Sequence, residues 1–258
     1  MSLVTVDQEM QLMTLEEIAA EANLQVVANY GPFKQGLIMA AGMRKLQEHI
    51  SDSMMDDVMQ LQGSTLGFRT DKDSSGGYQV NVVRQVFIES VIRGLRPVGN
   101  EFNIIGGRLY ITKEGFARLV PSWPGISQLK LSPGVPQTGA NGALVPYRAS
   151  WMLNGKQESL ERLKVGEDDN RIPVRVNAGM GVDAIIGKAT RKMYAAIYGV
   201  LTGLGDAVPE GEVEDAPRAT AGARRSELTD ELPEVDPDPF DEQPRGKPAR
   251  RDGKLLET

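Results

Sequence analysis

The chain has 258 residues, of which 40% are hydrophobic, so it can bury a substantial core. It contains no cysteine, which excludes disulfide frameworks, thiolate zinc sites and cysteine nucleophiles. The first residues lack the basic and apolar regions of a signal peptide, and there is no apolar run of about 18 residues. We therefore expect a protein of the reducing cytoplasm with no membrane contact.

The formal net charge of −6 is distributed unevenly along the chain. Residues 206–258 hold 15 acids and 8 bases, so residues 1–205 hold the other 20 acids and 21 bases. Within that part, residues 126–200 carry 10 bases and 6 acids. The segment 205–258 is also rich in proline and poor in large apolar residues, so we expect an acidic, disordered C-terminal tail.

Residues 1–62 are predicted to form a helical region. Apolar residues at three- and four-residue spacing indicate helices at 15–29 and 34–50, interrupted by Gly31 and Pro32. Asp52 or Ser53 is the expected N-cap of a third, methionine-rich helix that ends near Gln62.

The next segment, residues 63–78, is polar and glycine-rich, which predicts a loop that a partner could order. A helix is predicted at 79–94, with Gly94 as its stop signal before Pro97. Its buried face is expected to consist of Val80, Val83, Phe87 and Val91.

A period of two then replaces the helical spacing. The β-prone runs 101–105 and 108–111 flank Gly106-Gly107, a hairpin-turn dipeptide, and Thr112 can cap a short helix at 113–120. Further strands are predicted at 126–131, 143–153 and 156–165, with a turn at Asn154-Gly155 between the last two. With a final helix at 182–200, this order predicts an α+β fold in which antiparallel hairpins form a sheet flanked by helices, over a core at 63–204.

Several features resemble metal or catalytic sites without completing them. Asp71 begins a sequence like a calcium-binding EF-hand loop, but its twelfth position is Val82 and not a glutamate. The glycines at 63–67 lack the Gly-Lys-Ser/Thr of a P-loop, and His49 is the only histidine. Three adjacent acids at 167–169 are more typical of a solvated loop than of a magnesium site. We predict no metal site, no catalytic residue and no enzymatic activity.

The helix at 182–200 carries the clearest candidate binding surface. Its predicted core stripe comprises Val182, Ile185, Ile186, Ala189, Met193, Ala196, Ile197 and Val200. Lys188, Arg191 and Lys192 fall together on the opposite side with no acid among them. A solvated helix face explains this pattern, and a row of cations that follows a phosphate backbone explains it as well.

The strand region adds candidate side chains, and these are Lys130, Arg148, Lys156, Arg171, Arg175, Tyr147 and Trp151. Aromatic rings among lysine and arginine residues suit stacking on unpaired nucleobases. Trp151 lies in an alternating strand, where a place in the core is equally expected.

Two sequence elements between residues 67 and 199 resemble a known family. The first is the helix 82–93 followed by Gly94-Leu95-Arg96-Pro97, Glu101-Phe102-Asn103-Ile104-Ile105, Gly106-Gly107-Arg108-Leu109-Tyr110 and Lys113-Glu114-Gly115. The second is Gly187-Lys188-Ala189-Thr190-Arg191-Lys192 with Tyr198-Gly199. In order and spacing they resemble the RecT/Redβ family of phage single-strand annealing proteins (recombinases).

The resemblance implies that the protein binds single-stranded DNA and anneals complementary strands without ATP, in phage-type DNA recombination and repair. It implies no cofactor beyond Mg²⁺, which would aid annealing. It implies phosphate contacts by Lys188, Arg191 and Lys192, with Arg148, Lys156 and Arg175 lining the same groove. Ala195 and Ala196 depart from the family, which often has a further base in this part of the helix.

The partners implied are single-stranded DNA, the annealed duplex, and further copies of the chain in a ring or helical filament built partly through residues 1–62. Through the tail they include a phage exonuclease or a host single-strand-binding protein. The compartment implied is the cytoplasm of a bacterial or phage-infected cell.

Two other function classes stay open. A phage structural or scaffolding oligomer would use the charged helix to pack against neighbouring subunits. A metal-dependent nuclease would use Glu101, Glu114 or Asp183, although these acids form no recognised spacing motif.

Overall fold

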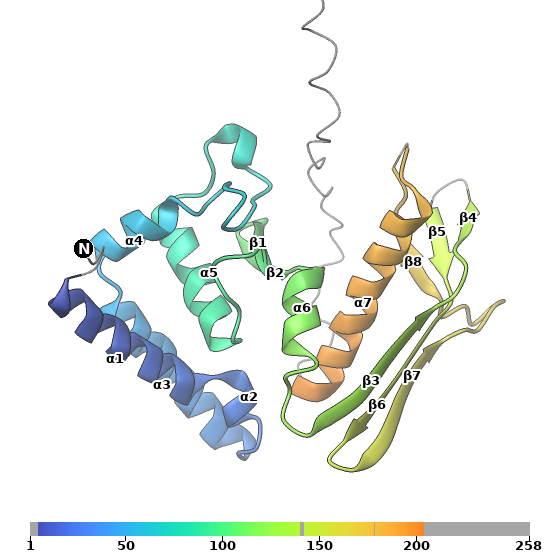
Figure 1. Cartoon of the computed structure of the whole chain (residues 1–258), viewed down its shortest axis with the longest axis horizontal. Helices are drawn as coiled ribbons and strands as arrows, with labels where there is room; N and C mark the ends of the chain where they lie inside the picture. Colours follow the sequence, from blue (N-terminus) through green and yellow to red (C-terminus); the bar gives the residue numbers. More distant parts are fainter. Residues whose placement is uncertain (1–4, 140–141, 178, 204–258) are drawn as a thin grey trace, which may run out of the picture. The chain divides into compact units, whose positions relative to one another are not determined.

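The computed structural model describes residues 5–139, 142–177 and 179–203, all within one of the two units into which the chain divides, residues 1–214 (Figure 1). The fold class is α+β, as predicted, with helices first and antiparallel hairpins and a long helix after them. The predicted tail at 205–258 lies outside the described residues. Within the described part, no helix is both long enough and apolar enough to cross a membrane.

The helices are α1 (Val6–Ala22), α2 (Leu24–Val27), α3 (Pro32–His49), α4 (Asp52–Met59), α5 (Val80–Ile92), α6 (Lys113–Leu119) and α7 (Val182–Thr202), with a short 3-10 helix η1 (Asp73–Ser75). The strands are β1 (Phe102–Ile105), β2 (Arg108–Ile111), β3 (Ile126–Pro133), β4 (Gln137–Gly139), β5 (Gly142–Val145), β6 (Tyr147–Leu153), β7 (Lys156–Arg162) and β8 (Ile172–Val174).

The first predicted helix is wrong at both ends. It begins at a capping box, in which Thr5 and Gln8 exchange side-chain and backbone hydrogen bonds, and Asn23 ends α1 and caps α2. Apolar periodicity missed the start because Met10 and Met13, near it, are exposed, so those turns face no core. The third helix lies where it was predicted, although its N-cap is Ser51 and not Asp52 or Ser53, and it ends at Met59 and not near Gln62.

Helix α5 lies at the centre of the N-terminal half, between α1, α3 and α4 and the β1–β2 hairpin (Figure 1). Its predicted single face is wrong, because Val80 is 41% exposed, and the buried residues are Val83, Val86, Ile88, Ser90 and Ile92. A helix enclosed on several sides buries more than one stripe. Its predicted stop is confirmed, since Gly94 has a φ of +79°.

The loop at 63–78 is ordered by contacts within the chain. The Tyr78 hydroxyl donates to Asp71 Oδ1 (2.8 Å) and accepts from the Gly107 N–H (2.8 Å). The Thr70 hydroxyl donates to Asp73 Oδ1 (2.7 Å). The carboxylates that resembled a calcium loop are therefore engaged in fixing this loop and the nearby hairpin.

The strands form a β1–β2 hairpin and two three-stranded sheets, ordered β3-β6-β7 and β4-β5-β8. The predicted turns are confirmed, since Gly106, Gly107, Asn154 and Gly155 all have positive φ. The strand predicted at 143–153 divides at Pro146 into β5 and β6, which belong to different sheets. The three-residue strands β4 and β8 were not predicted.

Helix α7 packs against both three-stranded sheets and against α6 (Figure 1). Its bounds agree with the prediction, and Ile185, Ala189, Met193 and Ile197 of the predicted stripe are buried, but the stripe differs at its ends and on one side. Val182 and Val200 are 57% and 58% exposed, whereas Ala195 and Tyr198 are buried. The difference arises because α6 covers the second side of α7, where the Tyr198 and Phe116 rings meet with centroids 5.6 Å apart.

Candidate nucleic-acid interface

The basic side of α7 is half-buried and built into the fold. Arg191 Nε donates to the Ile111 carbonyl of β2 (2.9 Å), and its guanidinium carbon lies 3.7 Å from the centroid of the Tyr110 ring. Lys192 Nζ donates to the Pro173 carbonyl of β8 (2.7 Å). Carbonyl oxygens and an aromatic ring fix a cation in place without cancelling its charge. These contacts therefore position positive charge between β2 and β8.

Lys188 lies on α7 near Lys192, and Arg175 lies just after β8. Lys188 is half-buried one helical turn before Lys192. Arg175 is exposed and follows β8 two residues after Pro173, whose carbonyl receives Lys192. Three of the predicted residues thus lie on one side of α7, and Arg175 follows the strand whose backbone Lys192 contacts.

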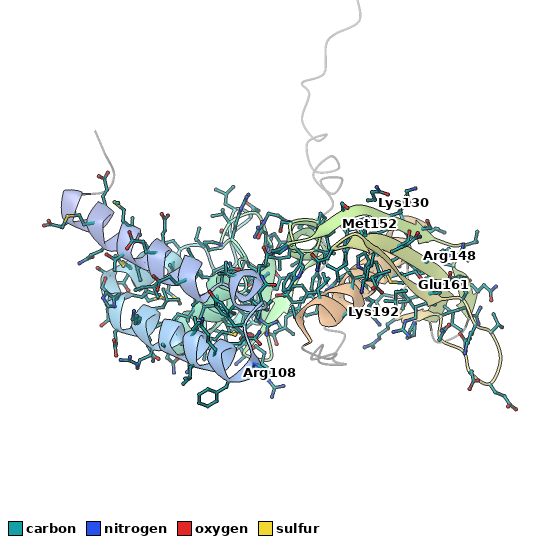
Figure 2. All side chains as sticks on the ribbon, turned by 90° about the horizontal axis from the view of Figure 1, so that it is seen from below. Arg108, Lys130, Arg148, Met152, Glu161 and Lys192 are labelled. Carbon is teal, nitrogen blue, oxygen red and sulfur yellow. The ribbon has the colours of Figure 1, made fainter. Side chains whose placement is uncertain are left out.

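Two other predicted cations lie on the far face of the β3-β6-β7 sheet. Along β6 the residues Tyr147, Ala149 and Trp151 are buried toward the core, so Arg148 faces outward. Lys130 of β3 pairs with Ser150, which lies two residues from Arg148 on the same face of β6. Arg148 Nε is bound to Glu161 Oε1 of β7 at 2.8 Å. Figure 2 shows Lys130, Arg148 and Glu161 along the sheet and Lys192 on the helix beneath it.

The single groove expected from Arg148, Lys156 and the α7 cations is therefore not formed. Arg148 is separated from α7 by the thickness of the sheet, and its charge is balanced by Glu161. Lys156 is exposed beside the Asn154-Gly155 turn, paired with Leu153 at the end of the sheet. Strand alternation decided this outcome, because it assigns neighbouring residues to opposite faces.

Three further candidates are buried and cannot face a ligand in this structure. Tyr147 is 1% exposed, and its hydroxyl lies 2.9 Å from Thr190 Oγ1, while burial raises its pKa. The Trp151 ring is buried in the same sheet face. Arg171 is buried as well, with Nη2 2.5 Å from Asp169 Oδ2 and Nη1 2.5 Å from Gln137 Oε1. We leave these three residues out of the candidate interface.

The aromatic side chain that contacts Arg191 is Tyr110, for which the sequence pattern predicted no role. Its pairing with Arg191 joins residues 81 positions apart, and nothing local in the sequence indicates it. The one available signal was its alternation with Arg108 in a predicted strand, which assigns both residues to one face of β2.

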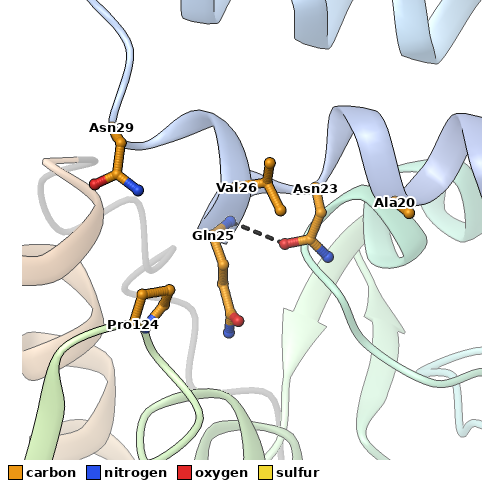
Figure 3. A pocket seen from close by; sticks show the side chains of 6 residues that line it. All are labelled: Ala20, Asn23, Gln25, Val26, Asn29 and Pro124. Carbon is orange, nitrogen blue, oxygen red and sulfur yellow. Dashed lines mark hydrogen bonds between the residues drawn. The ribbon is translucent and has the colours of Figure 1, made fainter.

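Among the described residues, two of the shallow depressions are lined by none of the α7 cations. One, of about 500 Å³, lies between the α1–α2 junction and Pro124 (Figure 3). Its amides are already engaged, since Asn23 Oδ1 accepts from the Gln25 N–H and Gln25 Nε2 donates to the Leu119 carbonyl. The other, of about 590 Å³, follows the irregular start of β3 beside Tyr194. Neither brings charged groups together.

No protein-family model, curated protein or solved structure matches this chain. The fold and the site therefore define its class. It is an α+β protein with a basic and aromatic surface between a hairpin and a long helix.

Proposed function

We propose that this protein binds single-stranded DNA along the basic side of α7 and anneals complementary strands without ATP. The main support is the contact of Arg191 with Ile111 and Tyr110. It joins the two sequence elements that resemble the RecT/Redβ family, the hairpin with α6 and the basic helix, in one packed unit. In this proposal the protein acts by binding and performs no catalytic step.

The positive charges on α7 favour a bound anion over exposure of this side of the helix to solvent alone. Lys188, Arg191 and Lys192 lie within about one turn of α7, where like charges repel one another. A row of cations on one side of an element suits the regular negative charge of a nucleic-acid backbone. Contact through phosphates leaves the base edges available, so pairing between the two strands supplies the sequence recognition.

We also propose that the protein works as an oligomer, a ring or helical filament. Each copy contacts few phosphates. Linking copies along a strand therefore raises the effective concentration at which the remaining copies meet the DNA. Helix α3 supports this, because it exposes Phe33 (81%), Leu37 (57%) and Ala40 on the side away from the core. Oligomers without affinity for DNA would instead favour a structural or scaffolding role.

The remaining parts of the proposal rest on sequence. The acidic tail would contact a phage exonuclease or a host single-strand-binding protein, and Mg²⁺ would assist annealing by screening the two strands. The protein would act in the cytoplasm of a bacterial or phage-infected cell.

The test is a double variant, Lys188→Ala with Lys192→Ala, titrated against a labelled oligothymidylate by fluorescence anisotropy at several salt concentrations. Two lost phosphate contacts should weaken binding and reduce the slope of log affinity against log salt by about 1.4. Annealing of two complementary oligonucleotides, followed with and without ATP, should slow in parallel.

The matched control is Lys45→Ala with Lys164→Ala, which removes the same charge from exposed sites on α3 and after β7. It should bind and anneal like the unmodified protein. An unmodified protein with no salt-dependent affinity for the oligonucleotide would refute the proposal, and so would equal losses in the two double variants.

A further inference from the structure

Strand β2 presents an open edge toward α7. The two-residue turn makes Ile105 and Arg108 the first hydrogen-bonded pair of the hairpin, so Asn103 and Tyr110 form the next, and Ile111 belongs to a non-hydrogen-bonded pair. The Ile111 carbonyl therefore points away from β1. Arg191 meets it there, which fixes the open edge of β2 against the basic side of α7.

Arg108 lies on the same face of β2 as Tyr110, because side chains two residues apart in a strand share a face. The two Cα atoms are about 7 Å apart along the strand. Since the Tyr110 ring packs against the Arg191 guanidinium, this face of the hairpin borders the basic side of α7. Figure 2 shows Arg108 on the same side of the molecule as Lys192, opposite Lys130.

The Arg108 side chain is exposed, and among the residues that the structure describes it makes no ion pair or hydrogen bond. Neighbouring arginines differ in this respect, since Arg96 and Arg118 both lie against Glu101. Asp71, which binds the turn through the Gly106 N–H (3.1 Å), also accepts from the Tyr78 hydroxyl. Arg108 thus carries a charge that the fold of the described residues does not use.

We infer that the β1–β2 hairpin is the second wall of the nucleic-acid interface, with Arg108 as a phosphate contact that continues the row of α7 cations across β2. This inference rests on the proposed function. Arg191 is then a positioning residue, which holds the hairpin at a fixed distance from Lys188 and Lys192 through Ile111 and Tyr110. The ligand recognised is the phosphodiester backbone of a single strand.

A site-specific crosslink tests the inference, because the chain contains no cysteine and any introduced thiol is unique. Arg108→Cys should form a disulfide with an oligonucleotide that carries an activated disulfide on a short backbone tether, because the cysteine thiolate displaces the leaving thiol. Lys130→Cys, on the far face of the β3-β6-β7 sheet, is the matched control and should form little conjugate.

Affinity gives the second measurement. Arg108→Ala should weaken binding of oligothymidylate several-fold and lower its salt slope by about 0.7, with an unchanged melting temperature because the side chain is exposed. Arg69→Ala is the control, since Arg69 lies beyond the opposite edge of the hairpin, where its carbonyl accepts from the Ile104 N–H. It should bind like the unmodified protein.

The outcomes separate the two claims. If the unmodified protein does not bind the oligonucleotide, the proposed function and the inference both fail. If it binds, and the α7 double variant weakens binding, the proposed function stands. In that case normal affinity of Arg108→Ala and equal conjugation of the two cysteine variants would overturn the inference alone.

Discussion

The arginines of this protein differ in how much of their charge the fold uses. Arg118 lies against the buried Glu101, with Nε 2.6 Å from Oε1, and it also donates to the Gly94 carbonyl. Arg171 is bound by Asp169 and Gln137. Arg191 is held by the Ile111 carbonyl and the Tyr110 ring. A count of basic residues treats these side chains alike, whereas their partners decide which of them can attract an anion.

Gly115 shows how one residue keeps the hairpin and α6 together. A Cβ at this position would lie 2.1 Å from the Glu101 carbonyl oxygen, so Gly115→Ala must push α6 away from the backbone that leads into β1. We expect a loss of about 1–3 kcal/mol in the free energy of unfolding, measured by urea denaturation.

Gly187→Ala in α7 is the control, because a Cβ there meets nothing within 4 Å. Since alanine favours a helix over glycine, this variant should gain about 0.5–1 kcal/mol. Equal stability of the two variants would contradict the tight packing at Gly115.

Asp169 gives a prediction for pH. Hydrogen bonds from Arg171 hold the pKa of its carboxyl below the ordinary value of 3.8. A lowered carboxyl pKa contributes stability that is complete above the ordinary value and is lost as the pH falls through the folded value. The stability difference between the unmodified protein and Asp169→Asn should therefore shrink as the pH is lowered from neutral to about 3.

Urea denaturation at a series of pH values measures this difference. Asp168→Asn is the control, because within the described residues its side chain makes no hydrogen bond or ion pair. A pH-independent difference for Asp169→Asn would show that the ion pair with Arg171 does not contribute to folding.

At the scale of elements, the accuracy of each prediction depends on how far apart in the chain the residues that determine the feature lie. The Thr112 cap of α6, the stop at Gly94 and the two hairpin turns were predicted because short-range sterics and hydrogen bonds fix them. The exposed start of α1, the division of a strand at Pro146 and the strands β4 and β8 were not predicted. The start of α1 is set by the local Thr5–Gln8 capping box, which apolar spacing does not report. The strand pairings depend on which neighbour a strand meets, and apolar spacing carries no such information.

The candidate site divides in the same way. The helical wheel correctly grouped Lys188, Arg191 and Lys192 on one side of α7, because helical geometry is local. It could not show that Arg191 meets Tyr110, because that contact joins residues far apart in the chain. Arg148 and Tyr147 are adjacent in sequence but face opposite sides of a sheet, so sequence proximity joined residues that the fold separates.

At the scale of the whole molecule, the exposed apolar side of α3 is the feature that the single chain does not explain. If that side contacts a second copy, Phe33→Ser with Leu37→Ser should shift the protein to smaller assemblies in sedimentation velocity. Affinity for a long oligonucleotide should fall with it, because fewer linked contacts remain.

Val135→Ser is the control, since Val135 is also strongly exposed but lies between β3 and β4, far along the chain from α3. It should leave the assembly state unchanged. A monomeric unmodified protein at all concentrations would remove the basis for this interface.

The sequence by itself determined the α+β class, most helices and turns, and the grouping of cations on α7, because each follows from interactions within a few residues along the chain. Only the tertiary structure decided which cations share a surface. It separated Lys130 and Arg148 from α7 by a sheet, buried Tyr147, Trp151 and Arg171, and brought β2 with Arg108 and Tyr110 beside Arg191. The physical reason is that strand pairing and helix packing bring together segments that are distant in the chain. These contacts determine the face of the protein on which each charged side chain lies.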